Sequence, residues 1–231
     1  MRGLGRWLKW GLLGLVGLFV LWQLWLFSWV LFWGWFNPET TRFMDIRLAE
    51  LREKSASAQL QKQWVPYARI SNHLKRAIIA AEDAKFVDHE GFDWDGIQRA
   101  LEKNQKKGRF VAGGSTITQQ LAKNLFLSPT KSYLRKAEEA IITLMIEALW
   151  SKQRIFEVYL NVIEWGNGVF GAEAAARHYF GISAAQIGPE QAARLAGMVP
   201  NPRYYDRNRG APGLGRKAAI ILARMPAAEI P

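Results

Sequence analysis

The chain has 231 residues, no cysteine and a formal net charge of +11 at pH 7. The lack of cysteine excludes disulfides, thiolate catalysis and cysteine metal sites, but it does not decide the compartment. The basic surplus favours partners that carry phosphate groups or anionic lipid headgroups.

The N-terminal region contains a long apolar stretch. Residues 10–36 carry no charged side chain and exceed the roughly 20 residues needed to cross a bilayer. A secretory signal peptide has a shorter apolar core and a small-residue cleavage site, so we predict an uncleaved transmembrane anchor over 10–36. Arg2, Arg6 and Lys9 precede it, and the positive-inside rule therefore places residues 1–9 in the cytoplasm and the rest outside. Nucleic acid is not an expected partner there.

Residues 37–64 are charged and poor in apolar side chains, and we interpret them as a linker, with helix over part of it left open. Over residues 65–231 the apolar residues recur with a period close to 3.6, which predicts one all-α domain. The first helix is expected to begin after Ser71 as N-cap. Further helices are expected from Ser115 or Thr116 to Asn124 and over Tyr133–Trp150, Lys152–Val162, Gly171–Phe180, Pro189–Met198 and Leu214–Met225.

Ionisable groups are concentrated at residues 81–91, beside the apolar face of the first predicted helix. Glu82 lies on that apolar stripe, where desolvation tunes the proton affinity of a carboxylate for acid–base chemistry. A structural ion pair of Glu82 with Lys85 or a neighbouring cation that closes the helix is the alternative, and the residues alone leave both open. Asp83 and His89 are expected to hold the following turn.

Gly113 and Gly114 precede the predicted start of a helix, so backbone N–H groups there are candidates to face an anion. An ordinary capped helix is the alternative. The spacing is not the Walker pattern, because no Gly-Lys-Ser/Thr sequence is present, and this disfavours a nucleotide triphosphatase.

Arg135 and Lys136 lie four and three residues before Glu139, a spacing typical of a solvated ion-paired helix face. A second carboxylate pair, Glu82 with Glu139, becomes meaningful only if the fold brings both to one cleft. Lys123, Arg135 and Lys136 would then line that cleft.

Three motifs occur in the order Glu82-Asp83-x-x-Phe86-x-x-His89-x-Gly91, residues 113–124 and Arg135-Lys136-x-x-Glu139. In order and spacing they resemble those of the peptidoglycan glycosyltransferases, glycosyltransferase family 51. Later segments such as Tyr159-Leu160-Asn161 extend the resemblance over roughly residues 65–210. The resemblance implies a lysozyme-like helical domain of the monofunctional biosynthetic form, preceded by one transmembrane helix.

The resemblance further implies an enzyme that polymerises lipid II, a disaccharide-pentapeptide on undecaprenyl pyrophosphate, into linear β-1,4-linked glycan strands. Glu82 takes the position of the general base that deprotonates the 4-hydroxyl of the incoming sugar, and the reaction inverts the anomeric carbon of the donor chain. Lys123, Arg135 and Lys136 are the expected stabilisers of the leaving undecaprenyl diphosphate. Glu139 is the second catalytic candidate, either organising these cations or holding a divalent ion, Mg²⁺ or Mn²⁺. No organic cofactor is expected.

The same resemblance implies a set of substrate-binding side chains around the cleft. The set consists of Asp83, Phe86, His89, Ser115, Thr116, Gln119, Gln120, Lys123, Asn124, Lys131, Arg135 and Lys136. Lys131 stands where many relatives carry arginine, and it keeps the charge without the bidentate fork. The expected partners are lipid II, the lipid-linked glycan chain and the bacterial inner membrane, with cell-wall synthesis and division proteins as candidates. The catalytic domain is expected on the periplasmic side.

Two alternatives compete with this interpretation. A peptidoglycan-cleaving lysozyme or lytic transglycosylase also has an all-α fold with one essential Glu, which it uses as a general acid. The cation cluster favours synthesis, because a pyrophosphate leaving group needs cations rather than a strong acid. A non-catalytic scaffold of the cell-wall machinery is the other alternative, and it would leave the segment 113–124 without a purpose.

Overall fold

A computed structural model of the chain describes residues 2–109, 113–130 and 132–231. It divides into two compact units, Met1–Asn37 and Pro38–Pro231. The first unit is formed by helix α1 (Arg2–Trp35), in which the 27 residues Lys9–Trp35 have a mean hydropathy of 2.0. In the described part of the chain, α1 is the only helix long and apolar enough to cross a membrane. The prediction of a long apolar helix at the N-terminus is confirmed.

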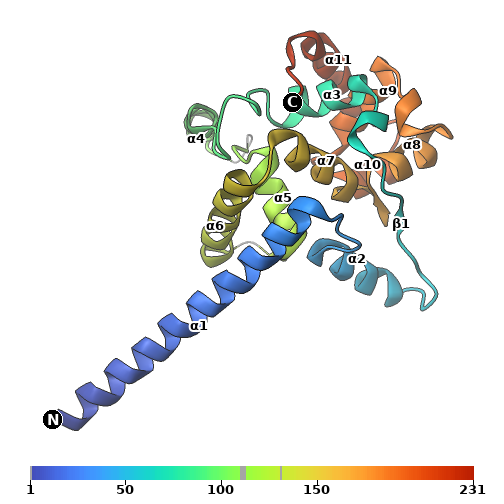
Figure 1. Cartoon of the computed structure of the whole chain (residues 1–231). Coiled ribbons are helices and arrows are strands. Elements are labelled where there is room, and N and C mark those ends of the chain that lie inside the picture. The colour runs from blue at the N-terminus through green and yellow to red at the C-terminus, as the bar shows by residue number, and fades with distance from the viewer. Residues whose placement is uncertain (1, 110–112, 131) are drawn as a thin grey trace. The chain divides into compact units, whose positions relative to one another are not determined.

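The second unit consists mainly of helices (Figure 1). Its α-helices are α2 (Arg42–Arg52), α3 (Asn72–Glu82), α4 (Trp94–Lys107), α5 (Ile117–Phe126), α6 (Tyr133–Leu149), α7 (Lys152–Val162), α8 (Ala172–Phe180), α9 (Pro189–Met198), α10 (Pro202–Arg207) and α11 (Pro212–Arg224). Single turns of 3-10 helix are η1 (Tyr67–Arg69), η2 (Ala184–Gln186) and η3 (Met225–Ala227). This composition confirms the predicted helical fold class.

One small sheet accompanies the helices. Its strands β1 (Gln61–Lys62), β2 (Glu164–Gly166) and β3 (Val169–Phe170) lie in the order β1-β3-β2. β1 runs parallel to β3, with Gln61 opposite Val169, and β2 runs antiparallel to β3, with Glu164 opposite Phe170. The sheet ties the segment before α3 to the segment between α7 and α8.

Helices α3, α9 and α11 pack together and form one part of the core (Figure 1). The 3.6-residue period of α3 places Leu74, Ile78 and Ile79 on its inner face, and all three are fully buried. Gly197 of α9 permits a close approach to α11, because a Cβ there would lie only 3.1 Å from Leu214. The core thus holds α3 firmly up to its last residue, Glu82.

Helix α5 packs against α6 and α7, and its first turn is fixed by a capping box. Thr116 Oγ1 accepts a hydrogen bond from Gln119 N at 3.2 Å, and Gln119 Oε1 accepts one from Thr116 N at 3.0 Å. Thr116 Oγ1 also donates to the carbonyl of Gly91 at 2.7 Å. Gly91 has a φ of +87°, and a Cβ there would lie 2.7 Å from Thr143, so glycine is required. These contacts join the turn after α3 to the start of α5.

The segment 37–64, which we predicted to be a linker, contains α2 and lies in the second unit from residue 38 onward. Helix α2 packs against α5, and Arg47 pairs with Glu164 of β2 at 3.2 Å. Arg203 of α10 pairs with Glu50 of α2 at 3.0 Å. Ion pairs to distant elements therefore hold a helix whose own apolar residues are sparse.

Two other helices were not predicted. Helix α4 buries only Ala100 among its described residues, so its apolar stripe is too weak to be recognised from the sequence. Helix α10 has six residues and begins at Pro202. A proline in the first turn lacks only an N–H group that has no helical partner, so it starts a helix as readily as it ends one.

Candidate active site

Glu82 ends α3 and is partly buried. Its Oε2 accepts a hydrogen bond from Gln120 Nε2 of α5 at 2.8 Å. The Tyr159 hydroxyl of α7 donates to Gln120 Oε1 at 2.8 Å and so fixes the orientation of that amide. Burial raises the pKa of the Glu82 carboxyl, and this effect exceeds the opposing effects of the Gln120 hydrogen bond and of the Lys217 and Lys123 ammonium groups. Glu82 is thus a carboxylate suited to take up a proton.

Asp83 fixes the backbone around Glu82. Its Oδ1 lies 2.9 Å from His89 Nε2, and its Oδ2 accepts a hydrogen bond from the backbone N–H of Ile117 at 3.0 Å. Ile117 is the first residue of α5. The Asp83 carboxylate therefore holds the end of α3 against the start of α5, the helix that carries the hydrogen-bond partner of Glu82.

Glu139 of α6 lies at the centre of the cation cluster. Its side chain is only 4% exposed. Oε2 accepts a hydrogen bond from an Arg135 guanidinium nitrogen at 2.5 Å, and Oε1 accepts one from the Lys136 ammonium group. Lys136 Nζ also lies 3.4 Å from Ser115 Oγ. The predicted solvated ion-paired face is thus a buried carboxylate that orients two cations, one of them half-exposed.

Lys123 connects the two carboxylates. Burial lowers the pKa of its ammonium group, while the charges of Glu139 and Glu82 both act to raise it. Lys123 thus interacts electrostatically with both carboxylates. That Glu82 and Glu139 share one cleft stays a prediction.

The surroundings of Glu139 do not suit a divalent cation. Both of its oxygens are occupied by cationic side chains, whereas Mg²⁺ or Mn²⁺ needs free oxygen ligands. The described residues contain no group of three or more His, Cys, Asp or Glu side chains that could hold a metal ion.

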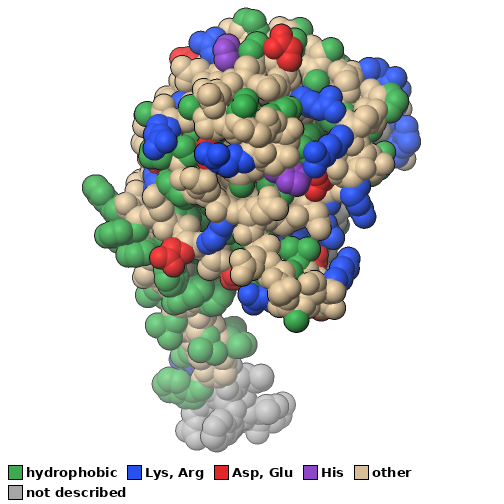
Figure 2. Space-filling model, turned by 90° about the vertical axis from the view of Figure 1, so that its right-hand side faces the viewer, with side chains coloured by type: hydrophobic (Ala, Val, Ile, Leu, Met, Phe, Trp, Pro, Cys, Tyr) green, Lys and Arg blue, Asp and Glu red, His purple; other side chains and the backbone are tan. Residues whose placement is uncertain are grey.

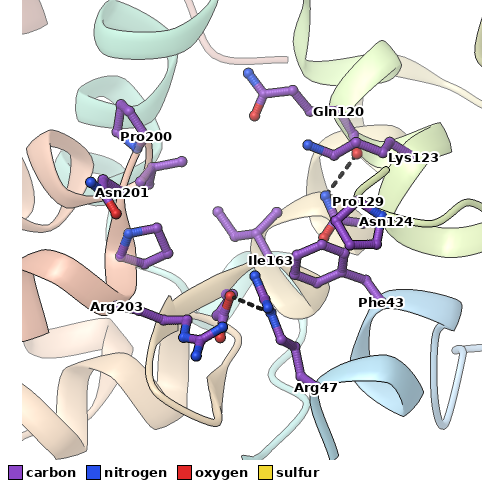
Figure 3. Close-up of a pocket in the computed structure, with 13 residues that line it drawn as sticks. Phe43, Arg47, Gln120, Lys123, Asn124, Pro129, Ile163, Pro200, Asn201 and Arg203 are labelled. Atoms are coloured by element: carbon purple, nitrogen blue, oxygen red, sulfur yellow. Dashed lines mark hydrogen bonds and ion pairs between the residues drawn. The ribbon is translucent and has the colours of Figure 1, made fainter. Parts of the chain in front are cut away.

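A cleft of about 300 Å³ is lined in part by Gln120, the hydrogen-bond partner of Glu82 (Figure 3). Its lining includes Gln120, Lys123 and Asn124 from α5, Arg47 from α2, Glu164 from β2, and Pro200, Asn201 and Arg203 from the segment that joins α9 to α10. Asn124 donates to the backbone carbonyl of Gln120 at 2.8 Å. Figure 3 shows Gln120 and Lys123 facing Pro200 and Asn201 across the open space.

Three of the predicted substrate-binding side chains are buried in structural roles instead. Thr116 and Gln119 form the capping box and are 2% and 3% exposed. Phe86 has no exposed surface and packs against Phe156, with ring centroids 5.5 Å apart. Their motif positions reflect the packing that brings α3 and α5 together, and they do not line the cleft.

Two further predictions concerned lysine side chains. Lys85 pairs with Asp95 at 3.0 Å, so the alternative pairing with Glu82 is wrong. Lys131 lies outside the described residues.

Several residues in the cleft or behind it were not assigned a role from the sequence. Tyr159 belongs to the quoted motif Tyr159-Leu160-Asn161, and that motif was the signal for it. Arg47, Glu164, Asn201 and Arg203 carry no local pattern, because their elements meet only in the tertiary structure.

The surface agrees with a site for anionic groups. Lys and Arg side chains outnumber Asp and Glu side chains on the face drawn in Figure 2. Three of the eleven net positive charges belong to Arg2, Arg6 and Lys9, which leaves +8 for residues 37–231. A phosphate-bearing ligand fits such a surface.

Comparison with known proteins gives a consistent set of relatives. The sequence model of a family described as Transglycosylase matches residues 49–226. A protein of Dechloromonas aromatica (strain RCB) is 82% identical over 231 residues, and one of Azoarcus sp. (strain BH72) is 63% identical over 231 residues, each alignment covering 100% of both chains. A protein of Nitrosospira multiformis is 64% identical over 206 residues, which cover 89% of this chain and 90% of the relative. All three relatives carry the name biosynthetic peptidoglycan transglycosylase.

Proposed function

The chain belongs to the transglycosylase family, and we propose that it polymerises lipid II into linear β-1,4-linked glycan strands with Glu82 as the general base. One observation carries the proposal. A carboxylate of raised pKa, Glu82, shares its site with Lys123 and the cations around Glu139. A base that is ready to accept a proton, next to cations that can stabilise a departing diphosphate, fits glycosyl transfer from a lipid diphosphate.

The reaction follows from this arrangement. Glu82 takes the proton from the 4-hydroxyl of the lipid II sugar, and the oxygen attacks the anomeric carbon of the lipid-linked donor chain. A new carbon–oxygen bond forms on the face opposite the diphosphate, while the bond to the diphosphate breaks and its electron pair leaves with undecaprenyl diphosphate. The configuration is therefore inverted and the product bond is β-1,4.

The surrounding residues have separate tasks in this proposal. Gln120 holds the Glu82 carboxylate, and its hydrogen bond leaves the other oxygen of Glu82 for the substrate hydroxyl. Lys123, Arg135 and Lys136 stabilise the negative charge that develops on the diphosphate. Glu139 keeps two of these cations in place.

Polymerisation of labelled lipid II by the purified full chain tests the proposal, with the glycan products separated on a gel. We expect chains from the native protein and none from Glu82→Gln. The proposal fails if the native protein makes no polymer or if the Gln variant makes as much. Solubilisation of preformed peptidoglycan without lipid II consumption would instead identify a lytic enzyme.

We also propose that α1 is a single-pass anchor in the inner membrane, with residues 1–9 cytoplasmic, 10–36 in the bilayer and the domain periplasmic. Arg2, Arg6 and Lys9 support this orientation. The chain has no cysteine, so single cysteines introduced by Gly3→Cys and Ser55→Cys report topology cleanly. A membrane-impermeant maleimide applied to spheroplasts should label only the Ser55→Cys variant. Labelling of Gly3→Cys alone would reverse the orientation.

A further inference from the structure

The cleft contains a carboxylate that the proposed reaction does not use. Glu164 is 6% exposed and lines the cleft. Its Oε2 accepts a hydrogen bond from Arg47 Nε at 3.2 Å. Its Oε1 is buried and has no hydrogen-bond partner among the described residues. A buried acceptor without a donor is costly, so it indicates a donor that arrives with a ligand.

The charges around Glu164 decide which kind of donor fits. Arg47, Arg203 and Lys123 line the same cleft. Glu50 pairs with both arginines but does not line the cleft, so cations still outnumber carboxylates there. A substrate ammonium group would be repelled by this surplus, whereas a neutral O–H or N–H group would not. The free oxygen of Glu164 therefore suits a sugar hydroxyl or an acetamido N–H.

We propose that Glu164 binds a neutral hydrogen-bond donor on an N-acetylated sugar of the lipid-linked substrate. Arg47 positions the carboxylate by holding its other oxygen. This inference rests on the proposed function, because it names the group recognised by the same cleft. Gln120 lines the cleft and also binds Glu82, so the sugar at Glu164 lies in the cleft where transfer occurs. Glu164 binds substrate and takes no part in the proton transfer.

Glu164→Gln tests the proposal. The Arg47 Nε–H group is a donor and selects the amide oxygen, so the amide NH₂ takes the place of Oε1 and meets the substrate donor with another donor. We expect KM for lipid II to rise about tenfold, the size of one hydrogen bond to a charged group, with kcat within about twofold of native.

Glu50→Gln is the matched control. It also removes a carboxylate from Arg47 and Arg203 but leaves the cleft lining intact. We expect its KM to stay within about twofold of native. Equal increases in KM for both variants would mean that Glu164 only anchors the arginines, and an unchanged KM for Glu164→Gln would also overturn the proposal.

Lipid II analogues that each lack one sugar O–H or acetamido N–H identify the donor with the native protein. One of them should bind to the native protein about tenfold more weakly than lipid II does. Its affinity for Glu164→Gln should be no lower than its affinity for the native protein, because both changes remove the same hydrogen bond. Coupling to an analogue that lacks a peptide ammonium group would overturn the sugar assignment. The two proposals fail separately: polymer made by Glu82→Gln at the native rate refutes the function, whereas a normal Glu164→Gln with an inactive Glu82→Gln refutes only this inference.

Discussion

Glu82 at the end of α3 and Glu139 in α6 are two carboxylates that both interact with Lys123 but lie in opposite environments. Both oxygens of Glu139 are bound by cations, from Arg135 and Lys136. Glu82 instead accepts a single neutral hydrogen bond from Gln120, and burial raises its pKa. A carboxylate paired with cations orders them, whereas one with a raised pKa accepts a proton more readily. The partners of the two carboxylates, from α5 for Glu82 and from the same helix α6 for Glu139, therefore divide the chemistry between them.

The largest expected effect is that of Glu82→Gln. We expect kcat/KM for polymerisation to fall at least about 100-fold, because the variant has no base. The same substitution should raise the melting temperature at pH 7. The raised pKa of Glu82 favours the fold below the ordinary value of 4.5, and this contribution is lost as the pH rises through the raised pKa. Calorimetry checks the sign, and the stability advantage of the variant should disappear at pH 4.

Glu139→Gln should affect stability in the opposite direction. Arg135, whose side chain is 17% exposed, loses its partner while Lys136 remains half-exposed to water. We expect a loss of about 2 kcal/mol of unfolding free energy, below the usual cost for a fully buried pair because of this exposure. Denaturant unfolding at pH 7 measures it. A variant as stable as the native protein would show that the cluster is not held by Glu139.

The acid limb of the pH–rate profile tests the difference between the two carboxylates directly. Glu82 must be ionised to act as a base, so the rate should fall as the pH drops through its raised pKa, above the ordinary 4.5. Gln120→Met removes the hydrogen bond that lowers this pKa, so the limb should move to higher pH. If the acid limb of Gln120→Met stays at the same pH as that of the native protein, a group other than Glu82 controls it.

The smallest expected effect concerns metal binding. Because both oxygens of Glu139 are occupied, the native protein and Glu139→Gln should bind Mn²⁺ equally, as measured by the loss of the free-ion electron paramagnetic resonance signal. If the native protein binds Mn²⁺ and Glu139→Gln does not, then Glu139 holds the divalent ion that the resemblance implied.

The sequence predicted those parts of the fold that rest on local patterns. Helices α7 and α9 begin and end where their apolar periods predicted, and Ser71 caps α3 as expected. Helices α4 and α10 were missed and helix in the segment of α2 was left open, because few of their own residues are buried. The apolar pattern within these segments is therefore too weak to predict the helices from the sequence.

The sequence by itself determined the apolar N-terminal helix, the helical class and the motifs that contain Glu82, Lys123 and Glu139, since each depends on residues close together in the chain. Only the tertiary structure decided how these residues differ. It placed Phe86 in the core, buried Glu139 and brought Arg47, more than a hundred residues away, against Glu164. Burial and long-range charge pairing arise only when distant elements pack, and they set which carboxylate accepts a proton, which orders cations and which is left to bind substrate.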